Sequence, residues 1–330
     1  MKTNHNRRQA IVCGAGALAG LAAPLSALAQ SATYPIRPVK IVVGYAPGGA
    51  ADIASRMLAE WLTNQMGQSF IVDNKPGASG TLAANLVAKA ANDGYTLSYG
   101  PGFGITMGSG SSRVEYKPDQ LFDPVHLMVE LPLVLVVNSA LPVRSVNELV
   151  AYAKANSGKL NYASYGKGTT SHLASESLIN QAQLKVEHIL YKGSAPAVLA
   201  LRSGEVQMMF DTVASAAPHV KAGALRALAV TSEHRMKLLP DVPTMAEAGM
   251  PGVRMSGWMG LFAPKATPGN IVTALSREVS AYLAQPATQS KFDGMGFVVQ
   301  DRGPDRFREL IVTETRRIER LVADAKIDLE

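Results

Sequence analysis

Two glycine-containing turns hold the residues whose types and spacing are best suited to bind a small anion. The first glycine turn consists of Ala46, Pro47, Gly48 and Gly49, between an apolar strand at 40–44 and a segment with helical periodicity. A strand, a tight turn and a helix start leave backbone N–H groups without partners, and such groups bind anions well. An ordinary strand–helix turn without a ligand fits the same residues, because many such turns contain glycine.

The second glycine turn has the same character. Gly166 and Gly168 follow a predicted strand, and Thr169 and Thr170 lead into a predicted helix that carries His172 near its start. Two roles fit His172, because its side chain either reaches a ligand carboxylate or packs near the helix start. The two turns are thus candidate anion seats at two strand ends.

Two carboxylates near strand ends also have two candidate roles each. Asp52 lies in the first turn of its predicted helix, where the helix dipole alone stabilises a carboxylate by about 0.3–1 kcal/mol. We therefore expect Asp52 to order the Gly48-Gly49 backbone rather than to contact an anionic ligand directly. Asp211 and Thr212 lie at a predicted strand tip. There Asp211 either accepts hydrogen bonds from a ligand or holds the N–H groups of a neighbouring loop.

The side chains that an enzyme needs do not form a recognisable motif. From residue 30 onward the histidines are at 126, 172, 188, 219 and 234, and no two of them have metal-ligand spacing. Ser164 and Lys167 match the Ser-x-x-Lys pattern of penicillin-recognising proteins, but its companion motifs are absent. A Gly-x-Ser-x-Gly elbow and the nucleotide-binding glycine motifs are absent as well. We therefore predict no catalytic residues, no metal and no cofactor.

The elements that must position the two turns alternate between strands and helices. Short apolar runs bounded by glycine, asparagine or proline predict strands, and apolar residues spaced three and four apart predict helices. Strands are predicted at 40–44, 68–73, 95–99, 131–137, 160–164, 186–190, 206–210, 225–231 and 258–262. Helices are predicted from residue 50 and at 81–91, 145–155, 172–181, 195–202, 244–248, 270–283 and 305–325. This alternation favours parallel sheets, in which ligands bind at the carboxyl ends of the strands.

Two α/β units follow one another along the chain, each with a glycine turn at a strand end. This arrangement predicts two lobes that face each other across a ligand cleft. The first crossing is placed at 138–142, and the strand at 258–262 is expected to return to the first lobe with the last helices. Two interpretations fit the Gly- and Ser-rich segment 101–123, which is either a mobile loop at the cleft or a variable surface segment.

The N-terminus has the pattern of an export signal. Lys2, Arg7 and Arg8 precede an uncharged Ala- and Leu-rich stretch, and Ala27-Leu28-Ala29 matches a cleavage site. A retained membrane anchor is the alternative, and both general and twin-arginine export fit. Without these three basic residues, 29 Lys and Arg face 26 Asp and Glu, a net charge of +3 that does not favour nucleic acid. The only cysteine, Cys13, would be removed with the signal, which excludes disulfides and thiol catalysis.

Motifs along the chain resemble the solute-binding proteins of tripartite tricarboxylate transporters, the Bug family. The matching stretches are Tyr34–Val43, Pro47–Asp52, Ala54–Arg56, Asp73–Gly80, Asp93–Leu97, Gly158–Ser164, Gly168–Leu173, Tyr191–Ala197, Leu225–Val230, Leu239–Gly249 and Trp258–Pro264. The resemblance covers nearly all of 33–330, and the motifs are specific as a set. Gly44, Tyr45 and the segment 101–126 depart from the usual pattern, which affects the expected distal ligand contacts.

The resemblance implies an α/β, two-lobed periplasmic-binding-protein fold (type II-like), with two parallel-sheet lobes around a ligand cleft. The expected domains are a signal peptide at 1–29, a first lobe of 33–141 and 233–330, and a second lobe of 142–232. In this family the loops matching Ala46–Asp52 and Gly166–His172 hold the ligand carboxylate largely through backbone N–H groups and water. The loop Lys192–Ala195, which contains Gly193, and the strand tip at Asp211 and Thr212 complete the cleft.

The function implied by the resemblance is that of a periplasmic receptor without catalysis. Such a receptor binds a small organic carboxylate and delivers it to the membrane permease subunits of a tripartite transporter. We expect a monomer that does not bind nucleic acid. A periplasmic sensor for a membrane signalling protein fits the same sequence, and a hydrolytic enzyme on the same scaffold is the third, less favoured hypothesis. The residues do not distinguish among di- or tricarboxylates, acidic amino acids and aromatic acids.

Overall fold

The computed structural model describes residues 34–45, 47–48, 50–77, 80–101, 121–164, 166–191, 193–324 and 327. The chain divides into two compact units, Met1–Ile36 and Arg37–Glu330. Only residues 34–36 of the first unit are described, so the predicted signal peptide lies outside the described residues. Ala46, Gly49 and most of the segment 101–126 lie outside them as well. The architecture that follows is that of the second unit.

The strands of the second unit form one continuous hydrogen-bonded sheet. Their bounds are β1 Val39–Val43, β2 Phe70–Asn74, β3 Thr96–Pro101, β4 Phe122–Asn138, β5 Leu160–Ser164, β6 Val186–Leu190, β7 Met208–Thr212, β8 Leu225–Val230, β9 Ser256–Pro264 and β10 Val298–Arg302. The order along the sheet is β2-β1-β3-β9-β4-β7-β5-β6, and β8 and β10 also pair with β4. The strand β4 is therefore shared by the two wings of the sheet.

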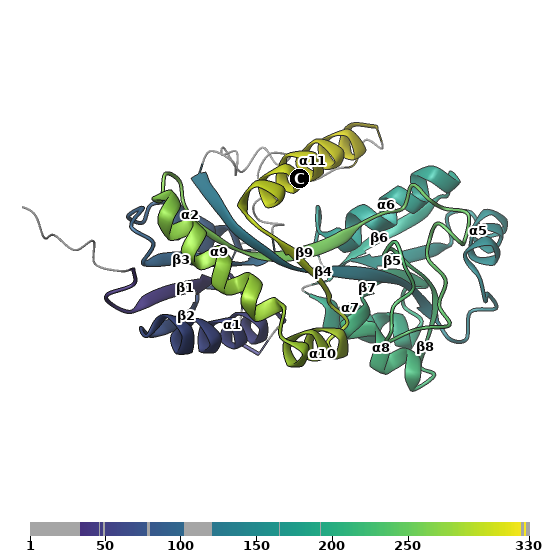
Figure 1. Cartoon of the computed structure of the whole chain (residues 1–330). Helices are drawn as coiled ribbons and strands as arrows, with labels where there is room; N and C mark the ends of the chain where they lie inside the picture. Colours follow the sequence, from purple (N-terminus) through teal and green to yellow (C-terminus); the bar gives the residue numbers. More distant parts are fainter. Residues whose placement is uncertain are drawn as a thin grey trace, which may run out of the picture. The chain divides into compact units, whose positions relative to one another are not determined.

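Helices cover both wings of the sheet (Figure 1). Their bounds are α1 Ala50–Met66, α2 Thr81–Ala88, α5 Val146–Ala155, α6 Thr170–Ala182, α7 Ser194–Ser203, α8 Val213–Lys221, α9 Gly269–Leu283, α10 Pro286–Gly294 and α11 Pro304–Asp324. In the described part of the chain, none of these helices is both long and apolar enough to span a membrane.

Each wing contains a parallel group of strands, as predicted. In the first wing β1 pairs in parallel with β2 and β3, and in the second β5 pairs in parallel with β6 and β7. Fully buried runs such as Ile41, Val42 and Val43 explain why helices cover both faces of these strands. The sheet as a whole is mixed, because β4 runs antiparallel to β7, β8, β9 and β10.

The long strand β4 connects the two wings. Its residues 122–132 pair with β9, and its residues 133–137 pair with β7. In Figure 1 β4 and β9 run together across the middle of the second unit, between β1–β3 on one side and β5–β8 on the other. The strand β9 also pairs with β3, so residues 258–262 lie beside the first strands of the chain.

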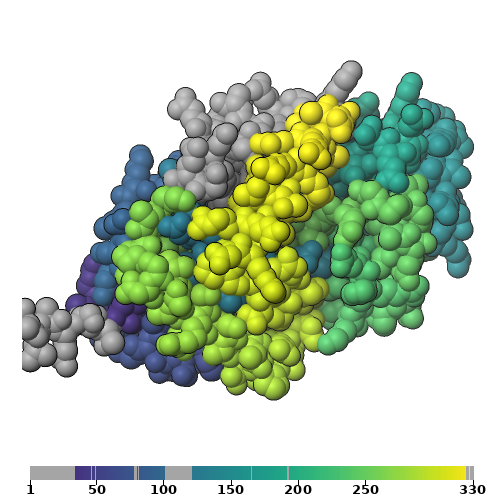
Figure 2. Space-filling model, turned by 45° about the horizontal axis from the view of Figure 1, so that its top comes forward, coloured from purple at the N-terminus to yellow at the C-terminus, as the bar shows by residue number. Residues whose placement is uncertain are grey.

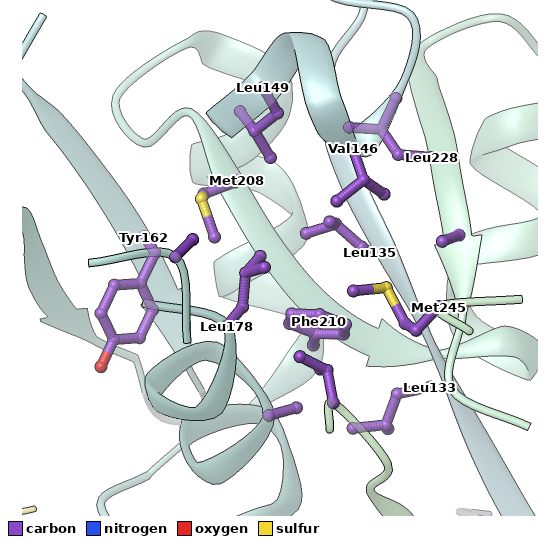
Figure 3. Packing of buried hydrophobic residues seen from close by; sticks show 14 of the residues in the cluster. Leu133, Leu135, Val146, Leu149, Tyr162, Leu178, Met208, Phe210, Leu228 and Met245 are labelled. Atoms are coloured by element: carbon purple, nitrogen blue, oxygen red, sulfur yellow. The ribbon is translucent and has the colours of Figure 1, made fainter. Parts of the chain in front are cut away.

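Separate apolar clusters stabilise the two wings. Figure 3 shows the packing of one cluster in the second wing, where side chains of β4, β5 and β7 meet those of α5 and α6. Its fully buried members include Leu133, Leu135, Tyr162 and Phe210. In the first wing, Phe262 of β9 packs against Phe307 of α11 with ring centroids 4.9 Å apart. Apolar burial of this kind contributes roughly 25 cal/mol per Å².

The predicted helix at 244–248 is wrong. Thr244 forms a parallel bridge with Val230, and Met245 N–H donates to the Val230 carbonyl at 2.8 Å. The segment is therefore fixed as a hydrogen-bonded turn beside β8. The sequence prediction also missed α8, α10, β10 and the first half of β4.

Candidate functional site

The first glycine turn is organised by the carboxylate of Asp52, which is 3% exposed. Gly48 N–H donates to Asp52 Oδ2 at 2.9 Å, Arg56 Nε donates to both oxygens at 3.0 Å, and Asn74 Nδ2 donates to Oδ1 at 2.9 Å. The Arg56 hydrogen bond, helped by Gly48 and Asn74, lowers the pKa of Asp52 to about 2 against the effect of burial. The carboxylate thus orders the Gly48 backbone, as the sequence suggested.

Close backbone packing holds Gly80 against Gly44, just before the first turn. A Cβ atom on Gly44 would lie 2.8 Å from Gly80 Cα, so no other residue fits there without movement. Asn74 Nδ2 also donates to the Tyr45 carbonyl at 3.0 Å, and Lys75 N–H donates to the Val43 carbonyl at 2.8 Å. Asn74 therefore connects two loops at the carboxyl ends of β1 and β2, although the sequence analysis assigned it no role.

The second glycine turn is held by His172 of α6 and by Thr169, the residue that precedes this helix. Gly168 N–H donates to His172 Nδ1 at 3.0 Å, which requires an unprotonated Nδ1. Thr169 caps the helix, because its Oγ1 accepts from His172 N–H at 3.4 Å and donates to the Gly166 carbonyl at 2.6 Å. Both glycines have positive φ angles, 149° at Gly166 and 72° at Gly168, which other residues rarely adopt. Thr170 begins α6 and is 8% exposed.

Three aromatic rings stack beneath the second turn. His188 lies between Tyr162 and His172, with ring centroids 4.7 Å and 4.5 Å away. Parallel pairing of β5 with β6 places Tyr162 opposite His188. Burial, together with the charge of Lys167, lowers the pKa of His188. Burial therefore favours the neutral form of His188 within the stack.

The structure also brings Ser164 and His188 together, a contact that the sequence analysis missed. Ser164 Oγ lies 2.7 Å from His188 Nε2, a distance compatible with a nucleophile and its base. The whole of Ser164 is inaccessible to solvent, and its hydroxyl also bonds to the Gly166 backbone at 3.3 Å. In this structure the pair therefore positions the second turn and presents no nucleophile to a substrate.

The predicted residues near α7 and α8 form a third cluster. Ser194 Oγ donates to Asp211 Oδ2 at 2.8 Å, and Thr212 N–H donates to Asp211 Oδ1 at 2.8 Å. Asp211 is fully buried, and burial raises its pKa. Gly193, with a φ of 120°, precedes α7, and Thr212 Oγ1 caps α8 by accepting from Ser215 N–H at 3.3 Å. Asp211 thus anchors the start of α7 and has no surface open to a ligand.

The three clusters lie at the carboxyl ends of strands from both wings. The second and third are neighbours, since Ser171 Oγ donates to the Phe210 carbonyl and Tyr191 N–H donates to the Ser164 carbonyl. The N-termini of α1 and α6 carry partial positive charge, which suits a carboxylate. Within the described ranges, no group of three His, Cys, Asp or Glu residues could hold a metal ion.

Comparison with known proteins identifies the family to which this chain is similar. The model of the tripartite tricarboxylate transporter family receptor matches residues 54–327. Protein BugT of Bordetella pertussis is 36% identical over 306 residues, which cover 91% of this chain and 92% of BugT.

Two solved structures of similar proteins contain dicarboxylates. Rpa4515 of R. palustris with adipate has a TM-score of 0.81 at 35% identity, covering 89% of this chain and 99% of Rpa4515. MatC (Rpa3494) of Rhodopseudomonas palustris with bound malate has a TM-score of 0.77 at 33% identity, covering 88% of this chain and all of MatC.

Proposed function

Because the chain belongs to the tripartite tricarboxylate transporter receptor family, we propose that it is a solute receptor for a small organic carboxylate. Its α/β fold is that of the family's periplasmic binding proteins. The observation that carries the proposal is the pair of glycine turns, each held by a buried side chain of its own helix. Asp52 holds Gly48, and His172 holds Gly168.

The ligand carboxylate is proposed to bind between the N-terminal turns of α1 and α6. Asp52 already holds Gly48 and His172 already holds Gly168, so little conformational entropy is lost at these two positions on binding. The contact set comprises the backbone of the two turns apart from the Gly48 and Gly168 N–H groups, which already donate to Asp52 and His172, with Gly193 and Thr212 at the edge of the site. Asp52 and Asp211 act through the loops that they hold. Adipate and malate, the ligands of the similar proteins, support a dicarboxylate as the ligand class.

The ligand is further proposed to lie between two lobes that close around it. Their bounds are those predicted from the sequence, 33–141 with 233–330 and 142–232. The shared strand β4 and the neighbouring β9 supply the crossings between the two wings. Hinge closure about such strands is a common mode of ligand capture.

The receptor is proposed to act without catalysis, outside the inner membrane. Permease subunits of a tripartite transporter are the proposed partners, and the periplasm is the proposed location, with residues 1–29 as a cleavable signal. Complete burial of Ser164 argues against hydrolysis at the Ser164–His188 pair.

Isothermal titration calorimetry with adipate, malate and citrate tests the proposal. At least one of these carboxylates should bind with a micromolar Kd, about 8 kcal/mol of binding free energy. The neutral diamide adipamide should not bind, since it lacks the charge that the helix N-termini attract.

A variant of the second turn makes the same titration specific. His172→Phe keeps a ring in the stack but removes the acceptor of Gly168 N–H, and should weaken binding about tenfold. His234→Phe, an exposed histidine on another segment, is the matched control and should bind normally. The proposal fails if protein shown by mass spectrometry to be ligand-free binds none of the acids. Unchanged affinity in His172→Phe would place the ligand elsewhere.

A further inference from the structure

A cavity of about 600 Å³ lies away from the glycine turns. Its walls come from β4, β9, β10, α11 and the segment 231–238, and none of the residues predicted to bind the carboxylate lines it. In Figure 2 the surface is hollowed between the yellow helix α11 and the green segment near residue 240. The volume falls in the range of pockets that hold small molecules.

We call it the hinge cavity, because the shared strands β4 and β9 help to line it. Most of the charged side chains around the hinge cavity are already paired. Arg254 pairs with Glu233, Lys237 with Asp293 at 2.6 Å, Arg317 with Glu314 at 2.7 Å, and Arg235 with Glu247 at 3.0 Å. Within each pair the positive and negative charges neutralise each other. The pairs therefore leave no net charge for a ligand to compensate. They surround two further charged residues, Glu130 of β4 and Arg302 of β10.

Glu130 and Arg302 face the same cavity without forming an ion pair. Arg302 makes no contact within 4 Å with a carboxylate of any described residue, although its charge acts on Glu130. Glu130 accepts a hydrogen bond from Gln300 Nε2 at 2.9 Å and another from Ser256. Burial raises the pKa of Glu130, and the nearby Glu314 and Glu233 raise it further. A cation beside Glu130 would therefore be favourable.

The floor of the cavity is apolar. Trp258, which pairs with Glu130 in the β4–β9 ladder, is 7% exposed, and Leu127 and Phe297 are 1% and 2% exposed. A simple anion in this cavity would be attracted by Arg302 but repelled by Glu130. A simple cation would be attracted by Glu130 but repelled by Arg302. The complementary ligand carries both charges on a short apolar body.

We propose that the hinge cavity binds an apolar α-amino acid as a zwitterion. The ammonium group lies at Glu130, the carboxylate lies at Arg302, and the side chain rests on Trp258. This site is separate from the proposed carboxylate site and does not depend on it.

Calorimetry with leucine and its two single-charge analogues tests the proposal. Leucine should bind, whereas 4-methylpentanoate, which lacks the ammonium group, and 3-methylbutylamine, which lacks the carboxylate, should each bind at least about tenfold more weakly. Glu130→Gln and Arg302→Gln should each weaken leucine binding by a similar factor. Arg306→Gln, which changes an exposed arginine of α11 outside the cavity, is the matched control and should bind normally.

Two further measurements localise the leucine. The chain has two tryptophans, so in Trp61→Phe only Trp258 remains, and its emission should shift on leucine binding. His172→Phe should leave leucine binding unchanged, because it alters only the second glycine turn. The proposal is overturned if leucine does not bind at about 10 mM, or if an analogue binds as tightly as leucine. Normal binding by Glu130→Gln or Arg302→Gln, or loss of binding in His172→Phe, would overturn it as well.

Discussion

Replacing Asp52 with alanine is expected to lower the free energy of unfolding by about 2–4 kcal/mol and to weaken carboxylate binding at least tenfold. The substitution leaves the Gly48 N–H, Arg56 Nε and Asn74 Nδ2 without their acceptor. Unfolding in urea and calorimetry with the best-binding acid of the panel measure the two effects.

Asp73→Ala is the matched control for Asp52→Ala. Asp73 lies in the adjacent strand β2 and pairs with Lys40 at 3.5 Å and Lys75 at 3.1 Å, both partly exposed. Because such surface pairs contribute about 0–1 kcal/mol, this variant should be nearly as stable as the wild type and should bind normally. Equal losses in the two variants would show that the hydrogen bonds of Asp52 have no special role.

The pH dependence of stability follows from the same carboxylate. The pKa of Asp52 in the folded chain is about 2, below its usual value of 3.8, so the folded state favours the ionised form. The stabilisation is therefore present above about pH 4 and is lost as the pH falls toward 2. It amounts to at most about 2 kcal/mol, since Arg56 is 53% exposed and solvent screens the pair. The stability difference between wild type and Asp52→Ala should shrink over this pH interval.

Gly260→Ala should destabilise the fold by about 3 kcal/mol. A Cβ atom on Gly260 would lie 2.6 Å from the His126 carbonyl oxygen and 2.6 Å from the ring of Phe307. Neither neighbour can move easily, because His126 belongs to the β4–β9 ladder and Phe307 is fully buried. Urea unfolding should show a lower midpoint with an unchanged slope.

Gly257→Ala in the same strand is the control for Gly260→Ala. The nearest atom to its added Cβ would be Leu131 Cβ at 3.5 Å, an ordinary contact. The change in unfolding free energy should stay within about 0.5 kcal/mol. If Gly260→Ala were equally harmless, β9 could not be packed against α11 as described.

The predictable part of the fold consists of elements whose pattern is local. Apolar runs such as Ile41–Val43 and Leu131–Val137 predict strands from their own residues alone. The first half of β4 contains Pro124, His126 and Glu130, and its pairing with β9 shifts register twice. Such polar residues depend on hydrogen-bond partners that are far away in the sequence. His126, for example, bonds to Ser276 and Asp301. No local pattern predicts such contacts.

The organisation of the glycine turns was predictable in part for the same reason. Asp52 and Gly48 are four residues apart in the sequence. The preference for a carboxylate in the first turn of a helix is enough to predict that Asp52 orders this backbone. Asn74 reaches Asp52 because β1 and β2 pair with Val43 opposite Asn74, and His188 reaches His172 because β5 and β6 pair with Tyr162 opposite His188. Strand register of this kind is not visible in a single sequence.

The central claim is that a ligand carboxylate binds at the two glycine turns. Titration of nitrogen-15-labelled protein with adipate or malate, followed by backbone amide NMR, tests it most directly. We predict that the amide signals of Gly48 and Gly168 and of the first residues of α1 and α6 shift together and saturate at one ligand concentration. Saturating shifts confined to other residues, with these amides unchanged, would contradict the claim.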